Sequence, residues 1–84
     1  MKDIFQTVYS PCCGTVEKIF VEPMSYVYEW EKLVLIKTNE EKEIEVSIGV
    51  SGNITALEIS QGQYVTPDTA LAVLKDDLEI TGSD

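Results

Sequence analysis

The sequence predicts an all-β domain in the form of a flattened barrel or sandwich of two small sheets. Three observations lead to this prediction. The stretch 8–37 is repeated, loosely but in register, by the stretch 46–75 at a constant offset of 38 residues. Apolar residues come in short alternating runs broken by Gly, Pro, Asn or Ser, which is the pattern of strands, and no window shows a sustained helical stripe. One irregularity in this alternation recurs in both repeats.

The internal repeat sets the architecture. The identical positions are Val8 and Val46, Gly14 and Gly52, Tyr26-Val27 and Tyr64-Val65, Leu33 and Leu71, and Lys37 and Lys75. A half of this size cannot bury a core alone, so we expect the two halves to close on one another about a pseudo-twofold axis. The segment 38–45 joins the repeats and has no copy, and it is therefore where we look for function.

Each predicted strand is a short apolar run that ends at turn-forming residues. In the first half, 4–10 alternates, Gly14 opens the run 15–22, a turn at Pro23 and Ser25 follows, and the half ends with 26–28 and 33–38. The second half repeats this order with 44–50, 53–60, a turn at 61–63, 64–65 and 70–75. We therefore predict one domain over residues 1–75 and a polar, disordered tail over 76–84.

The irregularity lies in the second strand of each half. Counting from Gly14 or Gly52, the apolar residues fall at +2, +5 and +7, so the inward-facing parity changes between the first and the second of them. A strand has a period of two, and a change of parity therefore needs a bulge or a sharp bend. Its recurrence predicts a corner in each half, where the sheet folds over onto itself.

Composition excludes several classes of function. The chain of 84 residues has a formal charge of −9 and no histidine, which argues against binding to nucleic acid or to an anionic membrane. The N-terminus lacks the apolar core of a signal peptide, and no run approaches the length of a membrane span. We expect a cytoplasmic protein. No nucleophile–base pair or phosphate-binding loop is present, so we expect no enzymatic activity.

The pattern resembles the biotinyl/lipoyl carrier domain, whose half repeat reads roughly P-x-x-G-x-V-x-x-I-x-V, then G-D-x-V and L-x-x-L. The matching stretches include 11–16 and 50–54, each with a central glycine, and the likeness covers about residues 8–75. It implies a barrel-sandwich hybrid of two four-stranded antiparallel sheets, with the hairpin between the halves exposed at one end. The chain departs from the family at Pro23-Met24, Trp30 and Asp68, where glycine is common; these are loop positions.

Modified members of the family carry biotin or lipoate on a lysine at the hairpin tip, within Ala-Met-Lys-Met or Asp-Lys-Ala. Counting forward from Gly14 places that site at Glu40, and counting back from Gly52 places it at Glu41, so the hairpin is predicted to be one residue longer than usual. Neither residue offers the amine that the attachment requires. Lys42 is the remaining candidate for cofactor attachment, one or two positions past the expected site, where a strand would turn it to the opposite face.

The favoured interpretation is an unmodified, stand-alone module that docks onto another protein or serves as a scaffold, with no cofactor. By family analogy the partner belongs to a carboxylase or 2-oxoacid dehydrogenase type of assembly. The alternative is a genuine carrier, modified with biotin or lipoate at Lys42, that shuttles carboxyl or acyl groups between active sites. A relative of the lipoyl-type domain in membrane adaptors is disfavoured, because eight residues leave no room for the helical insertion found there.

Three other groups of residues have a functional and a structural interpretation. Cys12 and Cys13 are adjacent, so a disulfide between them would be strained; we expect packing, with a redox or metal role as the alternative. The acidic residues of the hairpin are either a solvated surface or an attraction for a basic partner; they are Glu40, Glu41, Glu43 and Glu45. Four aromatic residues are predicted to cap the core at one end, or to leave an exposed subset for recognition; they are Tyr26, Tyr28, Trp30 and Tyr64.

Overall fold

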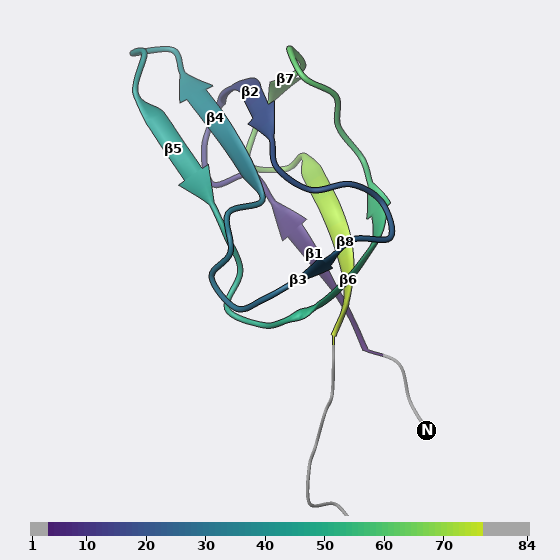
Figure 1. Cartoon of the computed structure of the whole chain (residues 1–84). Helices are drawn as coiled ribbons and strands as arrows, with labels where there is room; N and C mark the ends of the chain where they lie inside the picture. The colour runs from purple at the N-terminus through teal and green to yellow at the C-terminus, as the bar shows by residue number, and fades with distance from the viewer. Residues whose placement is uncertain (1–3, 77–84) are drawn as a thin grey trace, which may run out of the picture.

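The computed structural model describes residues 4–76, and its regular elements are eight short strands (Figure 1). They are β1 (Phe5–Tyr9), β2 (Gly14–Ile19), β3 (Tyr26–Val27), β4 (Val34–Thr38), β5 (Glu43–Val46), β6 (Gly52–Leu57), β7 (Tyr64–Val65) and β8 (Ala70–Asp76). No helix in the described range is long and apolar enough to cross a membrane. Each predicted strand is present, which confirms the all-β prediction.

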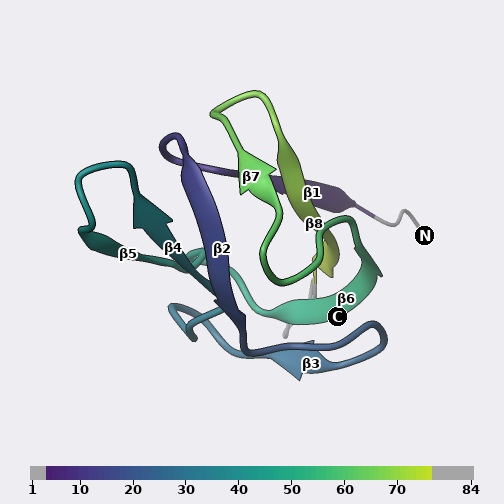
Figure 2. The same ribbon diagram turned by 90° about the horizontal axis from the view of Figure 1, so that it is seen from above.

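The strands form two four-stranded antiparallel sheets that enclose the core (Figures 1 and 2). The first sheet has the order β1-β8-β6-β3, and the second has the order β5-β4-β2-β7. Replacing each strand by its equivalent in the other half converts one order into the other. This exchange is what a pseudo-twofold axis requires, and it confirms the flattened sandwich predicted from the repeat.

The two predicted corners are present at equivalent positions. In the pair β2–β4 the register shifts between Val16 and Lys18, and in the pair β6–β8 it shifts between Ile54 and Ala56. Each bulge adds one unpaired residue, which reverses the face that later side chains occupy. This reversal explains why the apolar positions of the sequence change parity after Val16 in the first half and after Ile54 in the second.

The core obeys the same symmetry. Every buried apolar residue among those described has a buried partner at the offset of 38. The pairs are Val8 and Val46, Val16 and Ile54, Val21 and Ile59, Val27 and Val65, Leu33 and Leu71, Val34 and Ala72, and Ile36 and Leu74. The two halves therefore contribute equivalent side chains to one shared core, and neither half has a core of its own.

Some strand ends differ from the predicted ones. The second and sixth strands end at residues 19 and 57, before the predicted 22 and 60, because the chain leaves the sheet soon after each bulge. A single backbone hydrogen bond follows each end, from Phe20 N–H to the carbonyl oxygen of Leu33 and from Glu58 N–H to that of Leu71, both 2.9 Å. Strand β8 extends to Asp76. The rest of the predicted tail, 77–84, lies outside the described residues, as do residues 1–3.

Candidate functional site

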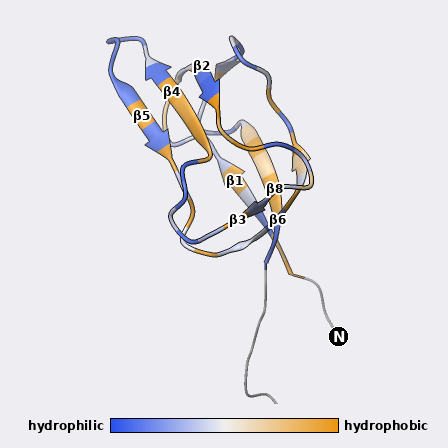
Figure 3. Ribbon diagram, in the orientation of Figure 1, coloured by the Kyte–Doolittle hydropathy of each residue, from blue (hydrophilic) through white to orange (hydrophobic). Residues whose placement is uncertain are grey.

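The hairpin of β4 and β5 projects from one end of the sandwich, and its tip is hydrophilic (Figures 1 and 3). Inward residues anchor its base, since Ile36 of β4 is fully buried and Val46 of β5 nearly so. Most outward residues are charged, and Lys37 lies opposite Glu43 in the ladder. The hairpin is thus held by the core at one end and exposed to solvent at the other.

The tip is a loop of three residues, 39–41, between the paired residues Thr38 and Lys42. The N–H of Thr38 donates to the carbonyl oxygen of Lys42 at 2.8 Å, and the N–H of Glu41 donates to the carbonyl oxygen of Thr38 at 2.8 Å. Glu41 adopts a left-handed backbone conformation with φ of 63°. A tight turn followed by one left-handed residue is a common three-residue hairpin connection.

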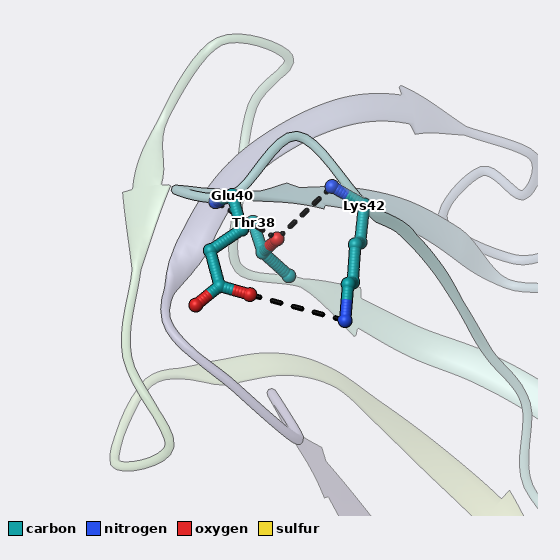
Figure 4. Close-up of polar contacts among 3 residues, drawn as sticks. All are labelled: Thr38, Glu40 and Lys42. Atoms are coloured by element: carbon teal, nitrogen blue, oxygen red, sulfur yellow. Dashed lines mark hydrogen bonds and ion pairs between the residues drawn. The ribbon is translucent and has the colours of Figure 1, made fainter.

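Thr38 fixes the conformation of the tip, a role that the sequence analysis missed. Its hydroxyl oxygen accepts hydrogen bonds from the N–H of Glu40 at 3.2 Å and from the N–H of Lys42 at 3.1 Å (Figure 4). The sequence contained an indication of this role, because a Thr at the start of a turn often forms a hydrogen bond with the backbone two residues further on. Tyr64 of β7 lies nearby, with its hydroxyl 3.5 Å from the amide nitrogen of Asn39.

The predicted site residues lie together, but the amine is not at the apex. Glu40 and Glu41 belong to the loop, and Lys42 is the first residue after it. The Lys42 Nζ lies 3.9 Å from Glu40 Oε1, and the two side chains are 72% and 79% exposed (Figure 4). An exposed pair at that separation contributes little to stability, so Glu40 does not immobilise the lysine.

This arrangement does not fit a biotinyl or lipoyl group at the apex. Such a group is joined through an amide, which requires an amine as nucleophile, and the apex presents the Glu40 and Glu41 carboxylates instead. Lys42 is the nearest amine. Lys37 lies lower on β4, within the ladder and opposite Glu43.

The remaining acidic and cysteine candidates lie at or near the same end. Glu43 and Glu45 extend along β5, and Glu45 forms an ion pair with Lys32 at 3.2 Å. Cys12 is half-buried and packs against the core, whereas Cys13 is exposed, and both are free thiols. Residues 4–76 contain no pocket and no group of three or more His, Cys, Asp or Glu side chains that could hold a metal.

The aromatic residues do not gather at one end, which corrects the sequence-based expectation. Tyr64 lies at the hairpin end, in contact with Asn39. Tyr26 lies on β3, paired with Asn53 of β6. The backbone N–H of Trp30 donates a hydrogen bond to the carbonyl oxygen of Ile48 in the β5–β6 connection. These four side chains are between 40% and 70% exposed, so they do not cap the core. The inward positions beside them, Val27 and Val65, already close it.

No protein-family model and no curated protein sequence matches the chain. Its fold is shared with parts of two larger solved structures. One is a single-chain, multi-domain long-chain acyl-CoA carboxylase, matched over 87% of this chain with a TM-score of 0.80 at 14% identity. The other is the urea carboxylase of Kluyveromyces lactis, matched over 88% with a TM-score of 0.77 at 20% identity. The chain spans only 7% and 6% of their lengths, and at these identities the likeness shows the fold alone.

Proposed function

We propose that this chain is an unmodified carrier-type domain that docks onto another protein and carries no prosthetic group. The observation behind this proposal is the hairpin tip, where Glu40 and Glu41 lie at the apex in place of an amine. The fold likeness to parts of two carboxylases supports the carrier-type half of the proposal. The carboxylates support the unmodified half, because a carboxylate forms no stable amide and repels an anionic acyl-phosphate.

The partner in this proposal is a protein of a carboxylase or 2-oxoacid dehydrogenase type of assembly. The two neighbours are themselves carboxylases, in which a segment with this fold is part of a much longer chain. A separate chain with the same shape can occupy an equivalent place in such an assembly, or hold its components together, without taking part in group transfer. The module itself has no enzymatic activity in this proposal.

A second candidate function rests on Lys42. Its amine is exposed, it follows the tip directly, and its contact with Glu40 is long. A ligase that tolerates a three-residue loop could reach it. The chain would then be a true biotin or lipoate carrier that moves carboxyl or acyl groups between active sites.

Intact-mass measurement of protein isolated from its native host distinguishes the two functions. We expect the mass of the unmodified chain, and an added biotinyl or lipoyl amide would refute the proposal. In vitro, biotin ligase or lipoate ligase with ATP and the free cofactor should leave the chain unlabelled. Two variants complete the assay. If the chain is a carrier labelled at Lys42, Lys42→Ala should abolish the label. Glu40→Lys tests whether an amine at the apex is sufficient for labelling.

A further inference from the structure

Three aromatic side chains, Tyr26, Tyr28 and Trp30, lie at and just beyond the edge strand β3, and we call them the aromatic corner. The rings of Tyr26 and Tyr28 meet edge to face, with centroids 5.1 Å apart and planes at 76°. Tyr28 is 68% exposed and Trp30 is 70% exposed. Large apolar surfaces left in contact with water at one place are typical of recognition sites.

Trp30 is held in position by the backbone around it. Its φ of 62° places it in the left-handed region, in a turn closed by a hydrogen bond from Glu31 N–H to the carbonyl oxygen of Tyr28 at 3.1 Å. The backbone N–H of Trp30 donates to the carbonyl oxygen of Ile48 at 2.8 Å. The indole lies so close to Gly49 that a Cβ there would be 2.7 Å from its Cζ2 atom. The absence of a side chain at Gly49 therefore lets the ring pack against the backbone there, while most of the ring surface stays exposed.

The other half of the molecule shows that the fold does not require these features. The equivalent turn at residues 66–69 is closed by the same backbone bond, from Thr69 N–H to the carbonyl oxygen of Thr66 at 2.8 Å. Thr66 and Asp68 occupy the places of Tyr28 and Trp30, and Asp68 has no positive φ. A bulky residue in a left-handed conformation is strained, and such strain tends to persist at functional positions. The first half thus keeps two exposed aromatic residues that the architecture does not need.

The charges around the aromatic corner indicate what it attracts. Glu29 and Glu31 flank Trp30 and are exposed. One oxygen of Glu31 accepts the N–H of Tyr28 at 2.9 Å, which holds this carboxylate beside the rings. The ion pairs found within residues 4–76 join Lys32 to Glu45 and Lys42 to Glu40, so neither flanking carboxylate is neutralised by them. A Trp face and nearby carboxylates both attract cations, and arginine also stacks on aromatic rings.

We propose that the aromatic corner docks a lysine- or arginine-bearing segment of a partner protein, with a basic side chain over Trp30 and its charge near Glu29 and Glu31. This inference rests on the proposed docking function and adds the surface and the chemistry of the partner. A second copy of the chain is a poorer occupant, because two molecules with a formal charge of −9 repel one another. The field of the whole molecule instead favours the approach of a basic segment.

The test uses two synthetic peptides and the amide spectrum of the ¹⁵N-labelled full chain. One peptide alternates glycine with arginine and lysine, and the other has glutamine at each basic position. We expect the basic peptide to shift the amides of residues 28–31 and of Ile48 and Gly49, with a binding curve that saturates. The shifts should weaken as salt increases, because exposed charges are screened beyond about 10 Å at 0.1 M ionic strength.

Three variants assign the effect to the indole. Trp30→Gly should fold normally, since glycine accepts a left-handed backbone, and it should weaken peptide binding about fivefold, the order expected for losing one exposed cation–π contact. Gly49→Ala should displace the ring and weaken binding as well. Tyr64→Ala removes an exposed aromatic residue from the other half, and it is the matched control that should bind as the parent does.

Several outcomes would overturn this inference. Shifts confined to residues 40–45 would place the basic peptide on the acidic hairpin, and equal binding of the glutamine peptide would remove the role of charge. Shifts of residues 28–31 that appear on concentrating the chain without peptide would identify a second copy as the occupant. Absence of any shift would reject the site. None of these results bears on the proposal that the hairpin tip is unmodified, which is tested by mass measurement alone.

Discussion

The two sheets of this molecule match on their inner faces and differ on their outer faces. The inward residues of β1 and β5 are equivalent, as Val8 and Val46 show. The outward residues of these two strands differ in chemistry, since Phe5 of β1 is equivalent to Glu43 of β5. Both face an equivalent lysine, Lys75 in one sheet and Lys37 in the other. Packing therefore constrains the residues of the shared core, whereas solvent-facing positions are free to acquire separate roles.

The ends of the sandwich differ in the same way. The hydrogen bond from Thr38 N–H to the Lys42 carbonyl oxygen has its equivalent in a bond from Asp76 N–H to the Ile4 carbonyl oxygen, each 2.8 Å. The bond between Thr38 and Lys42 joins strands that are connected by the hairpin loop. The bond between Asp76 and Ile4 joins the two ends of the described chain. One fold therefore presents a closed acidic tip at one end and, near the other, the aromatic corner.

The strongest test of the inner equivalence is a matched pair of core truncations. Leu33→Ala and Leu71→Ala remove equivalent leucines that are 1% and 0% exposed. We expect each to lower the free energy of unfolding by about 3 kcal/mol, from lost burial and the cavity left behind. Urea titration followed by circular dichroism measures both. Costs that differ by more than about half of that value would show that the halves do not share the core equally.

A second test concerns the close contact at the start of β2. Gly14 pairs with β4 and β7 at once, and a Cβ there would meet the Lys37 carbonyl oxygen and lie 2.8 Å from Ile36 Cγ2. We expect Gly14→Ala to lower the free energy of unfolding by about 2 kcal/mol through overpacking. Gly62→Ala is the control with open space around it, and its φ of 91° limits the cost to about 1 kcal/mol. A smaller loss at Gly14 than at Gly62 would contradict the steric argument.

The shared features of the halves were predictable from sequence, and their differences in three dimensions were not. The buried apolar residues recur at the offset of 38, and the parity change after Val16 and Ile54 predicts both bulges, because burial leaves a periodic record in the chain. The exposed acidic hairpin followed from the gap between repeats. The sequence could not show that Trp30 rests on Gly49, because that contact joins two irregular loops with no periodic signal. For the same reason it placed Tyr64 and Tyr26 at one end.

A smaller effect distinguishes the turns after β2 and β6. Met24 and Gly62 are equivalent, and both have positive φ, 76° and 91°. Met24 is 81% exposed, so its side chain gains little from burial that would offset the strained backbone. Met24→Gly, which copies the other half, should raise the free energy of unfolding by about 1 kcal/mol. A shift of the urea midpoint to lower concentration would instead indicate that the Met24 side chain stabilises the turn.

The smallest expected effect lies at the bulges, where the halves use different side chains in the same place. Thr55 donates its hydroxyl to the Val73 carbonyl oxygen at 3.2 Å, whereas the equivalent Glu17 has a buried oxygen, Oε1, without a hydrogen-bond partner. Glu17→Thr should therefore raise the free energy of unfolding by about 0.5 kcal/mol, since an unpaired polar atom is replaced by one that can bond to Leu35 across the ladder. Thr55→Glu is the reciprocal change and should lower it. If both changes destabilise equally, each bulge is adapted to its own side chain, and the equivalence of the halves ends at the backbone.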